Sequence, residues 1–316
     1  MTITSSIVNS IDRTFADISS KILKANVVNL TYNINEQETS HVHLLDIKGY
    51  GPHPTIILVH GLGSSGNKFH NLILDLKKVY QHIIVVDLIG HGKTPVPAIL
   101  KNLENKNEFS KIYTECTIKM LGSVLTNYVN NTNQKPILFG TSLGGLIVAK
   151  TALQYSHFIH SIFLSASVSN IKEKDMQNIL NTFDIHNSEK ATELIKKLYI
   201  HHENDVFFDF YKFLIIPFIQ LHISNNETVQ NILKSIYNTK FLTVEEYKEL
   251  QKKLPIYVLF GQKDNILPHS CFDFFKDNLE KDSKTFLDYH PDFGHSPFLE
   301  NPKLLVSILE NFLDKI

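Results

Sequence analysis

The sequence predicts an α/β fold, in which a mostly parallel sheet carries helices on both faces. Several apolar runs are short and nearly continuous, as in strands that are buried on both sides. Helical patterns separate these runs, and such alternation is typical of parallel sheets. Two alternating segments come first, and the predicted strands lie at 27–34, 41–47, 55–60, 82–87, 135–140, 161–166, 255–260 and 284–289.

The predicted helices fill the intervals between these strands. One follows the glycine-rich turn 61–66 and is expected to run through Tyr80. The others are expected at 112–130, from Ser142 onward, at 269–279 and from 302 to the end of the chain.

One long stretch interrupts the alternation. Residues 168–250 contain no glycine and a single proline, and they are rich in Leu, Ile, Lys, Glu and aromatic side chains. We expect a helical cap at 168–250, inserted into one core formed by 27–167 and 251–316. The apolar segment 206–221 either lines an acyl pocket or packs between cap and sheet, and the sequence leaves both readings open.

Residues 1–26 form a predicted helical extension. Apolar side chains recur there at intervals of three and four residues, which is one face of a helix; they are Ile7, Ile11, Phe15, Ile18 and Ile22. We expect this helix to pack on the domain. Peripheral contact with a lipid surface stays open, although the charges of the segment are mixed rather than basic.

The composition excludes several classes of protein. The 31 basic and 32 acidic residues leave a net charge of −1, so no nucleic acid partner is expected. No apolar run reaches the roughly 18 residues of a transmembrane segment, and no secretory signal is recognisable. Cys116 and Cys271 have no metal or redox spacing, which favours a reduced, cytoplasmic protein; one disulfide is the alternative.

The strongest motif surrounds Ser142. The predicted strand 135–140 leads directly into Gly140-Thr141-Ser142-Leu143-Gly144, a G-x-S-x-G match followed by a helix. A nucleophilic serine at this point needs a sharp turn that raises its hydroxyl above the sheet, and that turn has room only for glycines on either side. The interpretation is a catalytic Ser142; the alternative is an ordinary helix-entry turn.

A serine nucleophile needs a base and an acid that orients the base. Asp264 follows the predicted strand 255–260, and His295 follows the last strand and precedes the final helix. Both therefore belong to the edge of the sheet where ligands bind. The sequence predicts Asp264 and His295 in these roles; the alternatives are His290 and His269 as base, and Asp288 and Asp292 as acid.

Acyl transfer also needs backbone donors for the oxyanion. The N–H of Leu143, directly after the serine, is one predicted donor. The second is the N–H of Leu62, in the loop His60-Gly61-Leu62-Gly63 that follows an early strand. Its glycines let the backbone approach the substrate.

The same loop supports a different interpretation. Residues 61–66 match G-x-G-x-x-G, and Asp87 ends the next strand, which is the pattern of a dinucleotide site. That hypothesis leaves Ser142, Asp264 and His295 without a function. A hydrolase explains all of these positions, so we expect no cofactor and no metal.

Taken together, these motifs resemble the α/β-hydrolase superfamily, in its esterase- and lipase-like branch. The matching segments are HGLG (60–63), DLIGHGKT (87–94), GTSLGG (140–145), FGQKDNILP (260–268) and FGHSPFLENP (293–302). The resemblance implies an eight-stranded sheet with a helical cap after the sixth strand. A serine at the nucleophile position argues against the dehalogenase and epoxide hydrolase branches, which use an aspartate there.

The function predicted from the sequence is hydrolysis of a carboxylic ester, with an apolar acyl group, through an acyl-enzyme. The substrate is expected to be a small molecule or an ester on an acyl carrier. A thioesterase, a carrier-protein methyl esterase and a C–C bond hydrolase use the same triad and stay open. A receptor-like protein that binds ligand with slow or no turnover is the alternative of another class.

Overall fold

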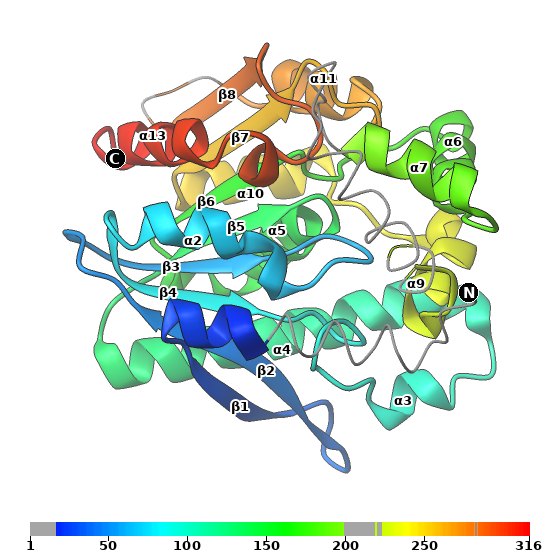
Figure 1. Ribbon diagram of the computed structural model, residues 1–316, viewed down its shortest axis with the longest axis horizontal. Helices are drawn as coiled ribbons and strands as arrows, with labels where there is room; N and C mark the ends of the chain where they lie inside the picture. Colours follow the sequence, from blue (N-terminus) through cyan, green and yellow to red (C-terminus); the bar gives the residue numbers. More distant parts are fainter. Residues whose placement is uncertain (1–16, 199–218, 220–222, 281, 283) are drawn as a thin grey trace.

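The computed structural model describes residues 17–198, 219, 223–280, 282 and 284–316, and an eight-stranded sheet runs through its centre (Figure 1). The strand order is β1-β2-β4-β3-β5-β6-β7-β8. Only the pairs β1–β2 and β2–β4 are antiparallel, so the predicted mostly parallel sheet is confirmed. The strands are β1 (Asn26–Asn33), β2 (Thr39–Lys48), β3 (His53–Val59), β4 (Tyr80–Val86), β5 (Ile137–Thr141), β6 (Ser161–Ser165), β7 (Ile256–Gly261) and β8 (Thr285–His290).

The central strands are apolar because both of their faces are covered. Along β3, Ile57 and Val59 belong to one apolar cluster, whereas Ile56 and Leu58 belong to a second cluster on the opposite face. All of β5 and β6 is buried, while the edge strand β8 is mostly half-exposed. The continuous apolar pattern therefore marks the centre of the sheet.

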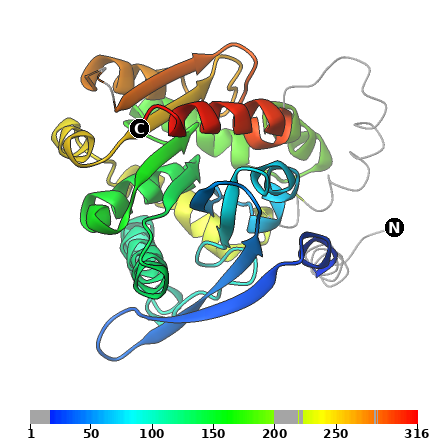
Figure 2. The same cartoon turned by 90° about the vertical axis from the view of Figure 1, so that its left-hand side faces the viewer.

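Helices cover both faces, as predicted (Figure 2, α13 in red and α4 in teal). On one face α2 (His70–Leu76) packs against α13 (Pro302–Leu313), next to the short α12 (Pro297–Glu300) and η1 (Gly66–Phe69). On the other face α5 (Leu143–Tyr155) packs against α4 (Phe109–Thr132) and α10 (Val244–Lys253). The remaining short elements outside the insertion are α3 (Ala98–Lys101), η2 (Lys106–Glu108), η3 (Ser156–Phe158) and α11 (Ser270–Asn278).

Two details of the core differ from the prediction. The helix expected to run through Tyr80 ends at Leu76, and Tyr80 instead opens β4 as a fully buried side chain. Cys116 and Cys271 are both free and buried, so the alternative of a disulfide between them is wrong.

The insertion after β6 is helical where the structure describes it. It contains α6 (Glu173–Phe183), α7 (Ser188–Leu198), α9 (Glu227–Lys234) and η4 (Ile236–Asn238). Figure 1 shows α6, α7 and α9 grouped beyond the carboxyl ends of the parallel strands. The apolar segment 206–221 lies outside the described residues, except for Ile219.

The predicted end of the cap at residue 250 falls inside α10. This helix packs on α5, and its Tyr247 and Leu250 are fully buried in the core cluster. We therefore propose that the cap ends before α10 and that this helix belongs to the core.

The N-terminal segment is helical at residues 17–23 and lies against α2. Ser19 bonds to His70, and the ammonium of Lys77 donates to the Leu23 carbonyl. Leu23 is 1% exposed, but Ile18 and Ile22 are 48% and 59% exposed. The apolar stripe is thus not the packing face in this part, and the predicted residues Ile7, Ile11 and Phe15 lie outside the described chain. None of the described helices has the length and apolar character to cross a membrane.

Candidate active site

Ser142 occupies a strained turn between β5 and α5. Its φ of 54° and ψ of −122° lie in a region that residues other than glycine rarely adopt. Its N–H donates to the Ser165 carbonyl at 3.0 Å, which ties the turn to β6. Strain of this kind costs on the order of 1–3 kcal/mol and is concentrated at functional sites.

The glycines of the motif are required by close backbone contacts. A Cβ on Gly140 would lie 2.5 Å from the Gly144 carbonyl oxygen. A Cβ on Gly144 would lie 2.4 Å from the His60 carbonyl oxygen. Any side chain at either position would therefore push the turn away from β3 and α5.

Asp264 and His295 meet at the carboxyl edge of the sheet. Asp264 follows the end of β7, and His295 lies between β8 and α12. The Nδ1 of His295 is 2.9 Å from Oδ2 of Asp264, and the two residues are 5% and 3% exposed. The other carboxylate oxygen accepts the N–H groups of Ile266 and Leu267 at 2.8 and 2.9 Å.

The contact with Asp264 identifies Nδ1 of His295 as a protonated nitrogen. A carboxylate only accepts hydrogen bonds, so Nδ1 carries a proton, and in the neutral imidazole the lone pair is on Nε2. Such a tautomer is the one that a general base needs.

The alternative residues lie elsewhere. His290 accepts the Asp292 N–H at 3.2 Å, and Asp292 is exposed. His269 bonds to the Tyr289 hydroxyl, and Asp288 accepts from the Tyr257 hydroxyl at 3.0 Å. None of the four lines the pocket that contains Ser142 and His295.

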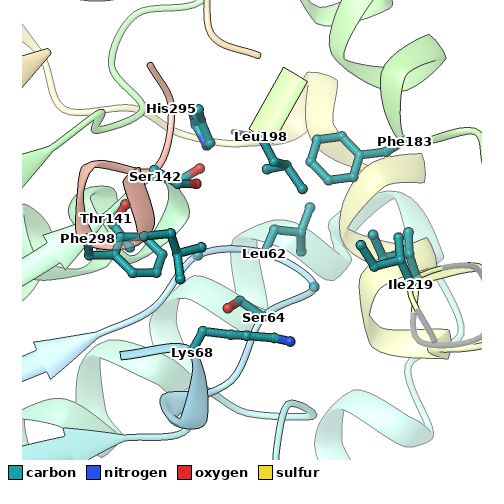
Figure 3. A pocket seen from close by; sticks show the side chains of 15 residues that line it. Leu62, Ser64, Lys68, Thr141, Ser142, Phe183, Leu198, Ile219, His295 and Phe298 are labelled. Atoms are coloured by element: carbon teal, nitrogen blue, oxygen red, sulfur yellow. The ribbon is translucent and has the colours of Figure 1, made fainter. Parts of the chain in front are cut away.

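That pocket opens between the sheet edge and the insertion (Figure 3). Ser142, Thr141 and His295 lie on one side, and Phe183, Leu198 and Ile219 on the other (Figure 3). The loop after β3 and η1 contribute Gly61, Leu62, Gly63, Ser64 and Lys68. Ile223 comes from the segment before α9, and Ser296, Phe298 and Leu299 come from the start of α12. The wall is thus mainly apolar, with Lys68 as a charged exception.

The two predicted backbone donors lie beside the serine. A Cβ on Gly61 would be 3.0 Å from the Cβ of Ser142, so the loop that carries Leu62 passes directly over the turn. Leu143 is the first residue of α5, where a backbone N–H has no acceptor within the helix. Leu62 lines the same pocket as Ser142, and Leu143 directly follows Ser142, so both positions are compatible with the predicted role as oxyanion donors.

His60 holds the loop 60–63 in place through hydrogen bonds of its side chain. It is fully buried, its Nδ1 bonds to the Gly61 carbonyl at 2.8 Å, and its Nε2 accepts the Leu88 N–H at 3.0 Å. Because the Leu88 amide can only donate, the imidazole is neutral with its proton on Nδ1. His60 supports the loop and does not face the pocket.

Asp87 supports the same region and is not a ribose ligand. Its carboxylate bonds to His43 at 2.8 Å and accepts the N–H groups of Gly66 and Lys93 at 2.8 and 3.0 Å. Burial disfavours its charged form, but the bond from His43 and the other contacts hold the pKa of Asp87 below its usual value. Since it is 5% exposed and fully engaged, the dinucleotide interpretation is wrong.

Sequence reasoning found only part of the cap side of the pocket: it offered the segment 206–221 as a possible lining, and Ile219, its one described residue, does line the pocket. Phe183, Leu198 and Ile223 come from helices whose apolar positions carry no motif, so only the fold reveals their place. His91 was visible only as part of the segment 87–94. The described residues also contain no group of three or more His, Cys, Asp or Glu side chains suited to a metal ion.

A family model described as "Serine aminopeptidase, S33" matches residues 50–302. The chain belongs to this α/β-hydrolase family. The predicted resemblance is thereby confirmed.

Individual relatives agree with this assignment. The chain is 25% identical over 276 residues to the pimeloyl-[acyl-carrier protein] methyl ester esterase of Wigglesworthia glossinidia brevipalpis, which covers 82% of this chain and 93% of that one. Among solved structures, a bacterial membrane phospholipase A has a TM-score of 0.73 at 15% identity, covering 98% and 92%. A 2-hydroxy-6-oxo-6-phenylhexa-2,4-dienoate hydrolase from Rhodococcus has a TM-score of 0.70 at 16% identity, covering 92% and 99%. The two structures support the fold.

Proposed function

We propose that this α/β-hydrolase cleaves a carboxylic ester with an apolar acyl group, through an acyl-enzyme on Ser142. His295 acts as general base, and Asp264 orients it. The observation that carries the proposal is the 2.9 Å contact between His295 Nδ1 and Asp264 Oδ2, at the pocket that contains the strained Ser142. No other serine lining this pocket has a φ in the left-handed region.

In the first step Ser142 is acylated. Nε2 of His295 takes the hydroxyl proton as Oγ attacks the ester carbonyl carbon. The carbonyl oxygen becomes an oxyanion, which the N–H groups of Leu62 and Leu143 stabilise. When the tetrahedral intermediate collapses, the imidazolium returns its proton to the leaving alcohol.

In the second step water replaces the alcohol. His295 removes a proton from the water, whose oxygen attacks the acyl carbon of the ester on Ser142. The C–O bond to Ser142 breaks, the serine oxygen takes the proton back, and the carboxylic acid leaves. Asp264 remains ionised and stabilises the imidazolium in both steps.

The pocket supports an apolar acyl group. Leu62, Phe183, Leu198, Ile219 and Ile223 face it, and each would lose contact with water when an acyl chain enters. The relative from Wigglesworthia supports an ester rather than a peptide as substrate, since it is named as a methyl ester esterase.

That relative also favours a more specific second candidate. A methyl ester at the end of a carrier-bound acyl chain would place its carbonyl at Ser142 and its chain along the apolar wall. A thioester or C–C bond substrate and a binding function with slow turnover remain predictions of the sequence. A cytoplasmic location and peripheral lipid contact are likewise predictions of the sequence.

The test is a panel of p-nitrophenyl esters of increasing acyl length, together with pimelate methyl ester, for the wild type and Ser142→Ala. The proposal expects turnover of at least one acyl length and a loss of about 10³-fold or more in the variant. Thermal unfolding of both proteins controls for folding. Equal rates in the two proteins would contradict the proposed nucleophile.

A further inference from the structure

His91 contacts the loop that carries the Leu62 donor. It lies in the turn that follows β4 and is 1% exposed. Its Nε2 accepts the Gly63 N–H at 3.1 Å, and its Nδ1 bonds to the Ile89 carbonyl at 2.9 Å. A backbone N–H can only donate and a carbonyl only accept, so His91 is a neutral imidazole with its proton on Nδ1.

The two buried imidazoles hold the two peptide units on either side of Leu62. His60 donates to the Gly61 carbonyl, which belongs to the same planar peptide unit as the Leu62 N–H. In a trans peptide the carbonyl and the N–H point in opposite directions, so this bond turns the Leu62 N–H away from His60. His91 accepts the N–H of the next unit, at Gly63. The orientation of Leu62 is thus fixed at both ends.

Gly63 needs this second anchor because its backbone is permissive. Its φ is +67°, a conformation that glycine reaches easily and leaves as easily. Without an acceptor for its N–H, the unit between Leu62 and Gly63 could rotate, and the neighbouring unit that carries the Leu62 N–H would then be held by His60 alone.

The turn that carries His91 is itself held by the insertion. The amide of Asn226 donates to the Gly90 carbonyl at 3.0 Å, and a Cβ on Gly90 would lie 2.3 Å from the Thr228 hydroxyl. The anchor for the oxyanion loop is therefore packed between the core and the residues that begin α9.

We propose that His91 is a positioning residue that acts through the Gly63 N–H to aim the Leu62 N–H at the oxyanion. It touches neither substrate nor reacting atoms, and it does not line the pocket. This inference rests on the proposed function, because it assigns the Leu62 N–H to the oxyanion. Its effect belongs to the transition state, so it acts on kcat rather than on KM.

Two amide substitutions distinguish the contributions of the two ring nitrogens of His91. Glutamine in His91→Gln can place its carbonyl oxygen where Nε2 lies, and so accept the Gly63 N–H. Asparagine in His91→Asn is shorter and reaches only the position of Nδ1, so it leaves Gly63 without an acceptor. Loss of one oxyanion donor lowers kcat by about 10²–10³; since His60 still holds the Gly61 carbonyl, we expect at least about a tenfold loss in His91→Asn.

The experiment compares kcat and KM of wild type, His91→Asn and His91→Gln on the best p-nitrophenyl ester of the panel. The inference expects a lower kcat with KM within about threefold for His91→Asn, and recovery to within about threefold of wild type for His91→Gln. Val306→Ala, a buried change in α13 away from the pocket, shows how much a general loss of stability lowers kcat.

Equal activity of His91→Asn and wild type would overturn the inference, as would equal losses in both amide variants. Nitrogen-15 NMR of the wild-type imidazoles provides a readout that needs no turnover. A proton on Nδ1 of His91 is expected, and a proton on Nε2 would overturn the inference. The proposed function fails separately, if the wild type hydrolyses no ester and Ser142 takes no fluorophosphonate label.

Discussion

Replacing Asp264 by asparagine should disable His295 without disturbing the fold. In the wild type, Oδ1 of Asp264 accepts two backbone N–H groups while Oδ2 faces Nδ1 of His295. Asparagine fits the same space, and its carbonyl oxygen is needed by the two N–H donors. Its NH₂ group must then face Nδ1, which becomes an acceptor, and the imidazole proton moves to Nε2. That nitrogen can no longer take the proton of Ser142.

The opposite orientation of the asparagine is also costly. It would restore the tautomer but turn the NH₂ group toward the N–H groups of Ile266 and Leu267. Each buried donor left unsatisfied costs about 1–3 kcal/mol. With both routes unfavourable, we expect Asp264→Asn to lower kcat by about 10⁴, as for the equivalent change in other triads. This corresponds to about 5 kcal/mol in the activation free energy.

The assay is the steady-state kcat for a p-nitrophenyl ester, with thermal unfolding to verify the fold. Asp292→Asn is the matched control, because Asp292 is exposed and lies near the same edge of the sheet. It should leave kcat unchanged. An Asp264→Asn enzyme within about tenfold of wild type, or an equal loss in Asp292→Asn, would refute the reasoning.

Three further predictions follow from packing and charge. Gly144→Ala should abolish ester turnover and lower the melting temperature, because its Cβ would lie 2.4 Å from the His60 carbonyl oxygen. Overpacking of this kind costs about 1–3 kcal/mol. Gly122→Ala is the control for a clash away from the site, because its Cβ would meet the Tyr155 ring. Phe183→Ala should shift the ratio of kcat/KM toward longer acyl chains, and an unchanged ratio would remove this side chain from the acyl wall. Asp87→Asn should lower the free energy of unfolding at pH 7 by about 1–3 kcal/mol. Because the pKa of Asp87 is lower in the folded state, its ionised form stabilises above the unfolded pKa of about 3.9, and this stabilisation is lost as the pH falls through the folded pKa. The difference between wild type and Asp87→Asn in urea unfolding should therefore shrink near pH 3, and a constant difference would contradict this role.

Much of the core could be predicted because its signals are local. A strand covered on both faces must be apolar along its length, and β3, β5 and β7 have that pattern. The turn at Ser142 has a similar local cause, since the contacts of Gly140 and Gly144 leave no room for side chains.

The pocket wall could not be predicted in the same way. Phe183 and Leu198 lie on amphipathic helices, where an apolar position looks the same whether it faces the core or a ligand. The N-terminal stripe shows the converse: Ile18 and Ile22 have helical spacing, yet in the described part Leu23 and Ser19 make the contacts with the core.

Hydrogen bonds between residues far apart in the sequence could not be predicted either. Asp87 has the position of a ribose ligand in a dinucleotide motif, but β2 places His43 next to it. His91 is 28 residues from Gly63, and only the folded chain brings its Nε2 to that amide.

The most direct test of the central claim is covalent labelling of the nucleophile. Wild type and Ser142→Ala are incubated with a fluorophosphonate probe, and the modified residue is located by mass spectrometry. We predict a single adduct on Ser142 in the wild type and none in the variant. An adduct on another residue, or the same labelling in both proteins, would contradict the assignment of Ser142 as the activated serine.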